Sequence, residues 1–582
     1  MYRYEKYLRP NRGLFPLSEL AERSAKDFGD LTVMRRWNGN GYDEISYREF
    51  ADRVHAVARW LLDNGLTSGD RIAVLGENRP EWGMVYLGVQ AAGGVIVPVD
   101  SMMPESGIRH IISDSESLKL FCSEKFHKVV SEMAPISTLK KIICMDDVDD
   151  PDTIPFAKVI EEGMKSETEL PKRELDEMAA IIYTSGTTGH SKGVMLTQGN
   201  LMSNVAAAGR ILPLGTSDTY LSVLPLHHTY ECTTGFLLAI YNGCSITYAR
   251  SMKSNELLDD MKRTKVTIMV GVPLLFEKFY QGITRKLSKA PIPQRIVVSI
   301  LFGLSKFGWN VGKMRWGKVL LKSLRVKAGM GSVIFFVSGG GPMDPRVADF
   351  FTYMGITALQ GYGLTETSPL TNVNLPARTR NITVGPAIDG VEQKIENPNS
   401  EGIGEIIVRG PNIFVGYYKN EEATKAVLSE DGWFHTGDLG KIHSDDCLQV
   451  TGRMKNMLVT AGGKNVYPEE IEHLLNRSQF INESIVLGVQ RASGYGEEVA
   501  ALIYPDYEQL DLHFEEEGFK PKDEDVVKLI KSEIAEAQKT LQDYKRVRRF
   551  RIMEEEFQKT STKKIKRFLY KGDMVGVNGQ NV

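Results

Sequence analysis

One short segment of the chain gathers an unusual number of groups that can bind phosphate. It reads Tyr-Thr-Ser-Gly-Thr-Thr-Gly-His-Ser-Lys-Gly from Tyr183 to Gly193 and follows an apolar run at residues 179–182. Glycines allow the backbone to turn tightly and to aim its N–H groups at an anion, while Lys192 adds a mobile positive charge. The segment therefore predicts a phosphate-binding loop behind a buried strand. The residues expected to contact phosphate are Thr184, Ser185, Gly186, Thr187, Thr188, Gly189 and Lys192.

The spacing within this loop excludes the Walker A motif of P-loop kinases and ATPases. That motif requires Gly-x4-Gly-Lys followed by Ser or Thr. Counted from Gly186, the second glycine would fall on Ser191, and Lys192 is followed by Gly193. Phosphate must therefore be held in a different framework.

A second motif begins at Gly361 and reads Gly-Tyr-Gly-Leu-Thr-Glu-Thr. Tyr362, between Gly361 and Gly363, offers a flat face on which a base can stack. Thr365 can donate a hydrogen bond to a phosphate oxygen. Glu366 provides a hard carboxylate ligand of the kind that Mg²⁺ takes beside phosphates. The motif predicts a site for a nucleotide together with a magnesium ion.

Two further segments add groups that could hold a nucleotide. Gly339, Gly340 and Gly341 follow an apolar run at residues 332–337, and a backbone without side chains permits the close approach of a planar ligand. Asp438 ends the segment Trp-Phe-His-Thr-Gly-Asp. A carboxylate at such a position can accept two hydrogen bonds from a ribose diol, as dinucleotide sites do.

In order and spacing these motifs resemble those of the adenylate-forming enzymes, a superfamily that includes acyl-CoA synthetases, luciferases and peptide-synthetase adenylation domains. The resemblance covers roughly residues 40–570. It implies that the chain activates a carboxylic acid with ATP, releases pyrophosphate, and passes the acyl group from AMP to coenzyme A. ATP and coenzyme A would be substrates and Mg²⁺ the cofactor. Adenine would lie on the glycines at 339–341, and the ribose would contact Asp438 and Arg453.

The same resemblance places a catalytic lysine near the C-terminus. The segment Lys-Thr-Ser-Thr-Lys-Lys-Ile-Lys-Arg, from Lys559 to Arg567, aligns with a family pattern that ends Gly-Lys-Ile-x-Arg. The catalytic lysine then falls on Lys564. Lys563 stands where glycine is usual in the family, and this departure leaves open which of the two lysines acts.

Four more positions take their expected roles from the family pattern. His228, in Leu-Pro-Leu-His-His-Thr-Tyr, is expected either to gate the acyl tunnel or to be a structural histidine. Lys455 occupies the hinge position, about which a small domain would rotate after adenylation. Gly462 and Gly463 would then line a channel for the pantetheine arm of coenzyme A.

The identity of the acid depends on a longer stretch of sequence. Residues 272–331 resemble the long-chain fatty acyl-CoA synthetase branch, which predicts a medium- or long-chain fatty acid. Two alternatives remain open: an aryl or alicyclic acid as substrate, and an acyl-AMP ligase that loads a carrier protein on another chain. A non-catalytic binding protein is disfavoured, because Lys192, Thr365, Glu366 and Asp438 are all present.

The framework that positions these motifs is predicted by an alternation of strands and helices. Residues 47–65 carry apolar side chains at helical spacing, and residues 80–92 also read as a helix. The short apolar runs at 71–75 and 94–99 read as strands. Strand, helix and strand in this order, with continuous apolar strands, are typical of parallel α/β architecture.

The last 130 residues or so differ in character, being rich in Lys and Glu. Short strands at 484–488 and 499–504 and a charged helix at 525–541 predict a small α+β domain. We therefore expect an α/β protein with a large N-terminal body at 1–452, in which helices flank β-sheets, and a mobile C-terminal domain at 453–582.

Composition limits the class of protein further. The chain has 582 residues and a net charge of −3, which does not favour nucleic-acid binding. Its five cysteines form no CxxC pair, which disfavours a structural zinc site and fits a reducing compartment. No apolar run reaches the roughly 20 residues of a membrane-spanning helix. A cytoplasmic location, with peripheral contact at the inner membrane surface as an option, is expected.

One stretch is not explained by these motifs. Residues 281–331 contain eleven Lys or Arg and no Asp or Glu, interleaved with aromatic and aliphatic side chains that include Trp309 and Trp316. A basic amphipathic segment of this kind suits an anionic membrane surface. The alternatives are a solvated basic face that steers anionic substrates, and a contact with a second copy of the chain in a homodimer.

Overall fold

A computed structural model describes residues 12–133, 135–184, 191–376, 379–460, 462–490, 497–519, 521–559, 565–570 and 580–581. These residues belong to two compact units. The larger contains the chain up to Gln393 together with 408–434 and 444–448, and the smaller contains 394–407, 435–443 and the chain from Gln449 onward. The expected α/β body and separate C-terminal α+β part are confirmed. The expected domain boundary between 452 and 453 stays a prediction.

The first eight-stranded sheet of the larger unit carries the phosphate loop. Its strand order is β18-β9-β8-β4-β3-β5-β6-β7. From β8 to β7 the neighbours pair in parallel, whereas β9 pairs antiparallel to both β8 and β18. The strands are β3 (Arg71–Leu75), β4 (Val95–Pro98), β5 (Lys119–Cys122), β6 (Lys141–Cys144), β7 (Thr153–Pro155), β8 (Met178–Thr184), β9 (Lys192–Thr197) and β18 (Gly416–Tyr417).

The second eight-stranded sheet has the order β15-β14-β13-β12-β10-β11-β1-β2. Only its two outermost pairs, β14–β15 and β1–β2, are antiparallel. This sheet carries the second motif, because β14 ends at Gly363. The strands are β1 (Thr32–Trp37), β2 (Tyr42–Ser46), β10 (Thr219–Ser222), β11 (Ser245–Tyr248), β12 (Ile268–Gly271), β13 (Phe335–Ser338), β14 (Thr357–Gly363) and β15 (Leu370–Val373).

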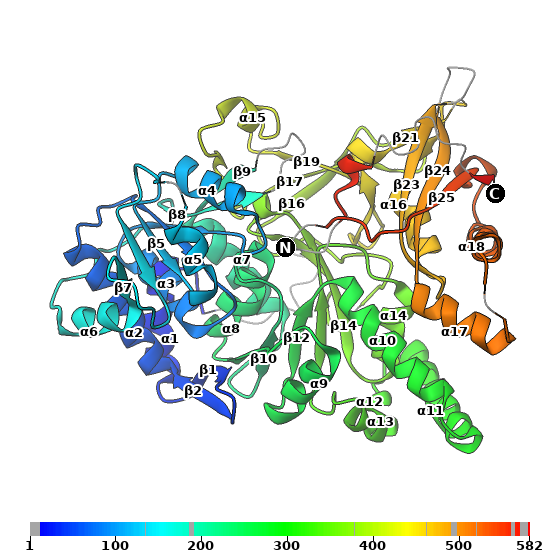
Figure 1. Ribbon diagram of the computed structural model, residues 1–582, viewed down its shortest axis with the longest axis horizontal. Helices are drawn as coiled ribbons and strands as arrows, with labels where there is room; N and C mark the ends of the chain where they lie inside the picture. Colours follow the sequence, from blue (N-terminus) through cyan, green and yellow to red (C-terminus); the bar gives the residue numbers. More distant parts are fainter. Residues whose placement is uncertain are drawn as a thin grey trace. The chain divides into compact units, whose positions relative to one another are not determined.

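Helices cover both sheets, as Figure 1 shows for the part of the molecule drawn in blue and green. The two helices expected from apolar spacing at 47–65 and 80–92 are α2 and α3. Helix α2 begins where the hydroxyl of Ser46 accepts a hydrogen bond from the Glu49 N–H. The helices are α1 (Leu20–Phe28), α2 (Tyr47–Asp63), α3 (Pro80–Ala91), α4 (Glu105–Asp114), α5 (Glu124–Ser131), α6 (Phe156–Lys165), α7 (Gln198–Ile211), α8 (Leu238–Tyr241), α9 (Ser254–Arg263), α10 (Pro273–Ser288), α11 (Ile292–Gly312), α12 (Gly317–Leu320), α13 (Lys322–Lys327), α14 (Pro345–Tyr353) and α15 (Glu421–Lys425).

Among its described residues, the smaller unit contains short strands and the α-helices α16, α17 and α18. Its sheets have the orders β16-β17-β19-β20, β21-β22 and β23-β24-β25-β26. The strands expected at 484–488 and 499–504 form the antiparallel pair β23 and β24, and the expected charged helix is α18. The elements are β16 (Glu392–Glu396), β17 (Gly404–Arg409), β19 (Phe434–Ile442), β20 (Leu448–Arg453), β21 (Leu458–Val459), β22 (Asn465–Val466), α16 (Pro468–Leu475), β23 (Ile481–Gln490), β24 (Glu497–Pro505), α17 (Tyr507–Glu517), α18 (Asp523–Ala537), β25 (Arg549–Ile552) and β26 (Gln580–Asn581).

Within the part of the chain described above, no helix combines the length and the apolar character needed to cross a bilayer.

An ionisable side chain lies in the core of the larger unit. Glu231 begins a π-helical segment, Glu231–Leu237, and is fully buried. Its Oε1 accepts a hydrogen bond of 2.7 Å from the Ser222 hydroxyl. Gly235 makes room for the carboxyl group, because a Cβ there would stand 2.7 Å from it. Burial raises the pKa of the Glu231 carboxyl to about 8.

The raised pKa makes the stability of this core depend on pH. The folded protein keeps the Glu231 proton up to about pH 8, whereas an ordinary glutamate releases it near pH 4.5. The contribution of Glu231 to stability is therefore complete below that lower pKa. It falls by up to about 1.4 kcal/mol per pH unit as the pH rises through this window. Glutamine does not titrate, so the Glu231→Gln variant lacks this loss. The difference in melting temperature, variant minus wild type, should therefore increase as the pH is raised. Glu169→Gln, at an exposed position, is the control; a constant difference at all pH values would contradict the assignment.

Candidate active site

The phosphate loop joins two antiparallel strands. Thr184, at the end of β8, pairs with Lys192, at the start of β9, so the ends of the loop lie side by side. A Walker A loop instead connects a strand to a helix, in agreement with the exclusion made from spacing. The predicted contacts Ser185, Gly186, Thr187, Thr188 and Gly189 lie outside the described residues.

Lys192 and Glu366 meet through a tyrosine that the motifs did not reveal. The Lys192 ammonium lies 4.9 Å from the centre of the Tyr417 ring. The Tyr417 hydroxyl donates a hydrogen bond of 2.8 Å to Glu366 Oε1. Burial, followed by the nearby Glu366 carboxylate, raises the pKa of the Tyr417 phenol, which therefore stays protonated and able to donate. Two residues 174 positions apart in sequence are thus brought to one place in the fold.

Tyr417 reaches this position because its strand is attached to the phosphate loop. Strand β18 pairs with β9, with Tyr417 opposite Val194 and Gly416 opposite Met195. In addition, the Phe414 N–H donates a 2.9 Å hydrogen bond to the backbone carbonyl of Glu366. A search of the sequence for long motifs could not have found Tyr417, because the Gly-Tyr-Tyr segment around it has no informative spacing.

The turn that contains Thr365 and Glu366 is held by two buried asparagines. The side-chain amides of Asn204, on α7, and Asn412 both donate to the carbonyl groups of Thr367 and Leu370, over distances of 2.8–3.1 Å. Asn204 Oδ1 also accepts from the Leu370 N–H. Since buried carbonyls without donors are costly, these amides are required for the turn to lie in the interior.

Glycine is needed on both sides of the candidate nucleotide site. At Gly363 a Cβ would stand 1.7 Å from the Pro369 carbonyl oxygen. At Gly339 it would stand 2.6 Å from the ring of Tyr230, whose hydroxyl donates to the Val337 carbonyl. Gly340 has a φ of +82° and Gly341 follows it. The predicted flat surface at 339–341 is therefore backed by an aromatic ring on one side.

Tyr362 and Gly361 lie at the end of β14. Tyr362 is half-buried and faces Asn372 across the antiparallel pair with β15. Thr365 and Glu366 follow in a single 3-10 turn, Thr365–Thr367. The sequence-predicted residues of this motif are thus brought together with Lys192, through Tyr417.

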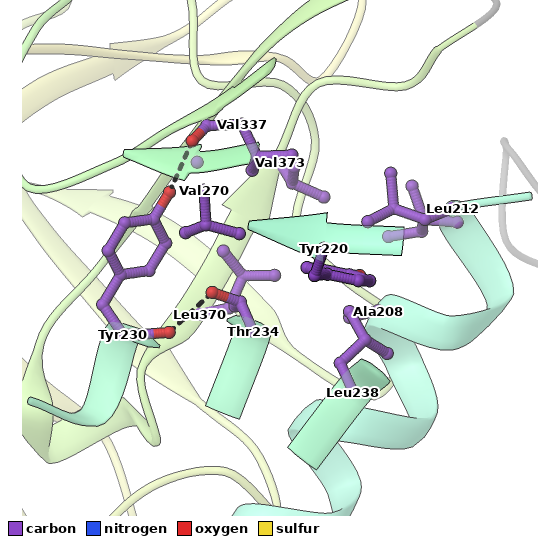
Figure 2. A pocket seen from close by; sticks show the side chains of 12 residues that line it. Ala208, Leu212, Tyr220, Tyr230, Thr234, Leu238, Val270, Val337, Leu370 and Val373 are labelled. Atoms are coloured by element: carbon purple, nitrogen blue, oxygen red, sulfur yellow. Dashed lines mark hydrogen bonds between the residues drawn. The ribbon is translucent and has the colours of Figure 1, made fainter. Parts of the chain in front are cut away.

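A small apolar cavity is lined in part by Gly361 and by Tyr230, whose ring lies against Gly339. Its volume is about 20 Å³, roughly that of one water-sized sphere. Figure 2 shows Tyr220, Leu238 and Val270 around it, with Tyr230 fixed at one side by its hydrogen bond to Val337. The lining residues are Ala208, Ile211, Leu212, Tyr220, Tyr230, Thr234, Leu238, Val270, Val337, Gly361, Leu370 and Val373. An apolar group joined to a ligand on the glycine surface could enter here.

His228 lies in a polar cluster next to this region. The imidazole of His227, which is 4% exposed, lies 3.1 Å from Asp100 Oδ1, and its ring centre is 4.3 Å from that of His228. His228 itself is partly exposed. The expected alternatives for His228, a gate or a structural histidine, both remain predictions.

The smaller unit brings Asp438 and Arg453 together. The Arg453 Nε lies 3.0 Å from Asp438 Oδ1, and the Asp438 side chain is 6% exposed whereas that of Arg453 is 54% exposed. The turn before Asp438 is fixed by Glu405, whose carboxylate accepts from the Gly437 N–H and is hydrogen-bonded to His435 Nδ1. Glu405 was not found from sequence, since it lies 33 residues before Asp438 on a different strand.

The predicted hinge residue and the two glycines predicted for the coenzyme A channel lie on turns. Lys455 is exposed in the 3-10 turn Met454–Asn456. That turn is braced by Glu469, which accepts from the side chain of Asn456. Gly462 and Gly463 are exposed between β21 and β22, and a Cβ on either would meet no atom within 4 Å. Lys563 and Lys564 lie outside the described residues.

Comparison with known proteins gives the family. The model of the AMP-binding enzyme family matches residues 21–418, and that of the AMP-binding enzyme C-terminal domain matches residues 455–571. The peroxisomal long chain acyl-CoA synthetase 7 of Arabidopsis thaliana is 29% identical over 503 residues, which cover 82% of this chain and 71% of that protein. The long-chain-fatty-acid–CoA ligase FadD15 of Mycobacterium bovis is 28% identical over 580 residues, with 93% of each chain covered.

A solved structure agrees with these relatives. The crystal structure of ATP-bound MatB from Rhodopseudomonas palustris is 26% identical, with a TM-score of 0.74, and covers 95% of this chain and 99% of that one. The fold is that of an α/β enzyme with two units. The chain belongs to the AMP-binding enzyme family and is an adenylate-forming acyl-CoA ligase.

The hydrogen bond between Tyr417 and Glu366 can be tested by removing one oxygen. Tyr417→Phe keeps the ring beside Lys192 but frees the Glu366 carboxylate to rotate. Adenylation, measured as pyrophosphate release, should fall about tenfold, equivalent to about 1.4 kcal/mol.

If both groups act through this bond, the combined Tyr417→Phe and Glu366→Gln variant should lose no more activity than Glu366→Gln alone. Tyr418→Phe, the neighbouring residue, is the control. Additive losses, or an equal loss in the control, would show that Tyr417 does not position Glu366.

Proposed function

We propose that this acyl-CoA ligase activates a medium- or long-chain fatty acid with ATP and Mg²⁺ and transfers the acyl group to coenzyme A. The observation that carries the proposal is the apolar cavity lined by Gly361 and by Tyr230, the ring that lies against Gly339 of the segment expected to bind adenine. An acid activated at this position would direct its hydrocarbon part into that cavity. Similarity to proteins named as long-chain acyl-CoA synthetases supports the same class of acid.

In the first step a carboxylate oxygen of the acid attacks the α-phosphorus of ATP. A new C–O–P linkage forms, and the bond between the α-phosphorus and the bridging oxygen breaks, so that pyrophosphate leaves. The protein has to position the two anions and neutralise their charge. Lys192 is proposed to hold the phosphates that depart, and Lys564 to hold the carboxylate and the α-phosphate together.

Glu366 fits the requirements of a magnesium ligand. It offers carboxylate oxygens in the turn that follows β14, and Mg²⁺ prefers such oxygens together with those of phosphate. The Tyr417 hydroxyl and the Phe414 N–H fix the position of Glu366. When bound, the ion would supply positive charge against the phosphates. Thr365, one residue earlier, is proposed to donate its hydroxyl hydrogen to a phosphate oxygen.

In the second step the thiol of coenzyme A loses its proton to solvent and its sulfur attacks the acyl carbon. A C–S bond forms, the bond between the acyl carbon and the AMP oxygen breaks, and AMP leaves with the electrons of that bond. Asp438 and Arg453 are proposed to hold the ribose. Rotation of the part that follows Lys455 is proposed to remove Lys564 and to bring Gly462 and Gly463 to the pantetheine arm. The open space around both glycines agrees with a surface that another chain of atoms approaches.

The cavity is much smaller than a fatty acyl chain. A medium- or long-chain acid therefore has to displace lining side chains such as Leu212, Leu238 and Tyr220. Apolar side chains can repack at modest cost, because no hydrogen bonds are lost when they move. The Tyr220 hydroxyl, which is buried without a hydrogen-bond partner, does not anchor that side chain.

The overall reaction is tested with purified protein, ATP, Mg²⁺ and a panel of fatty, alicyclic and aromatic acids, with coenzyme A present or absent. The expected result is AMP and acyl-CoA, with the greatest kcat/KM for medium or long chains. Acyl-AMP that accumulates with coenzyme A present would point instead to a carrier protein as acceptor. A preference for aromatic acids would overturn the proposed substrate class.

The cavity can be tested as the acyl site by filling it. Ala208→Val adds two methyl groups to the lining and should lower kcat/KM for long-chain acids by about tenfold while sparing the shortest acids accepted. Ala206→Val, on the same helix α7 and also buried but not in the lining, controls for general overpacking. Equal losses for all chain lengths, or equal losses in both variants, would show that the acyl chain lies elsewhere.

The catalytic lysine should matter for one half-reaction only. Lys564→Ala should lower adenylation at least ~100-fold, equivalent to ~2.7 kcal/mol. Thioester formation from supplied acyl-AMP should continue. Normal adenylation in Lys564→Ala, together with a loss in Lys563→Ala, would shift the assignment by one residue.

A further inference from the structure

Helix α11 exposes apolar side chains along its whole length. The exposed fractions are 68% at Ile292, 57% at Ile300, 60% at Phe307 and 67% at Val311. A surface helix of a globular protein normally turns such residues toward the core. The opposite side of α11 faces the core, where Ser305, Gly308 and Trp309 are buried and Leu301 and Phe302 are partly buried.

The exposed residues lie on one side of the helix. At 100° per residue they occupy an arc of about 120°, and the 21 residues of α11 extend about 31 Å. This apolar stripe is larger than the scattered apolar residues found on most monomer surfaces. It consists of Ile292, Ile296, Ile300, Leu304, Phe307 and Val311, each at least 46% exposed.

Basic residues border the stripe and continue beyond it. Arg295 and Lys306 lie next to one edge of the arc on the same helix, and both are exposed. Further exposed lysines follow at Lys318, Lys322 and Lys327. Residues 281–331 carry eleven positive charges and no negative one, although the chain as a whole has a net charge of −3.

We propose that the α11 stripe, together with the basic residues around it, docks on the surface of an anionic lipid bilayer. Apolar side chains along one face of a helix can enter the boundary between headgroups and acyl chains, while the basic residues pair with anionic headgroups. A second copy of this chain fits the surface less well, because a symmetric contact would bring positive charges against positive charges without a neutralising acid.

The docking surface is packed against elements that border the candidate active site. Phe302, on α11, stacks on Phe350 of α14 with ring centres 5.1 Å apart, and Tyr280 of α10 meets the same ring at 4.9 Å. Helix α10 begins at Pro273, whose Cγ lies 3.7 Å from the position of a Cβ on Gly341. Figure 1 shows α10, α11 and α14 grouped in the green part of the larger unit. If the acid is a fatty acid, as proposed above, it would be collected from the bilayer; docking itself does not depend on that.

The test uses sedimentation with vesicles of equal parts phosphatidylglycerol and phosphatidylcholine, and with phosphatidylcholine alone. The wild-type protein should sediment with the anionic vesicles at low ionic strength, less at high ionic strength, and little with the neutral ones. Replacing Ile296, Ile300 and Phe307 with Ser should lower the partition coefficient at least ~10-fold, and so should replacing Lys318, Lys322 and Lys327 with Gln. All six positions are exposed, so the melting temperature should stay unchanged.

Two control variants replace exposed apolar residues with Ser, or exposed lysines with Gln, elsewhere on the surface. Exposed Met102, Met164 and Met252 replaced with Ser, and exposed Lys125, Lys172 and Lys262 replaced with Gln, should bind vesicles like the wild type. The proposal is overturned if the wild type stays in the supernatant with anionic vesicles, or if the stripe variant binds as well as its control. It is also overturned if the wild type is a dimer by analytical ultracentrifugation, the stripe variant a monomer, and neither binds vesicles.

Discussion

The geometry of the candidate site depends on a small number of buried amide groups. Asn204 and Asn412 both donate to the carbonyls of Thr367 and Leu370, and Asn200 on the same helix as Asn204 donates to the carbonyls of Pro411 and Ile413. Without these donors the turn after β14 and the segment before β18 would carry unsatisfied carbonyl groups in the interior. The two segments that present Glu366 and Tyr417 are therefore fixed against one helix, α7.

This arrangement explains how a charged site is built at the edge of two sheets. Helix α7 follows directly after β9, so the residues that hold the Glu366 turn come from the same stretch of chain as Lys192. Tyr417 completes the connection, with its ring beside Lys192 and its hydroxyl on Glu366. The Lys192 ammonium and the Glu366 carboxylate thus contact the same tyrosine side chain, whose phenol stays protonated because its pKa is raised.

The larger unit contains apolar side chains in two opposite environments, one closely packed and one exposed to solvent. Around the cavity, Val270, Leu370 and Val373 pack so closely that only about 20 Å³ remains free. Along α11, side chains of the same kind are left in solvent. Burial of such side chains contributes roughly 25 cal/mol per Å², so leaving a whole stripe exposed forfeits stability that the fold could have gained. This loss is consistent with the proposal that a lipid bilayer covers the stripe.

Much of this protein could be predicted from local sequence. Continuous apolar runs at 71–75 and 94–99 and helical spacing at 47–65 predict the corresponding α/β elements, because side-chain periodicity follows directly from backbone geometry. The phosphate loop, the Gly361 motif and Asp438 could be predicted as site residues because the chemistry expected of them requires particular residue types in consecutive positions. Only the tertiary structure decided which residues fix them: Tyr417, Asn204, Asn412 and Glu405 act on partners 30–166 residues away. No local spacing encodes such contacts. The exposure of α11 was likewise decided by packing, since an amphipathic pattern specifies an apolar face but not whether the core or the solvent receives it.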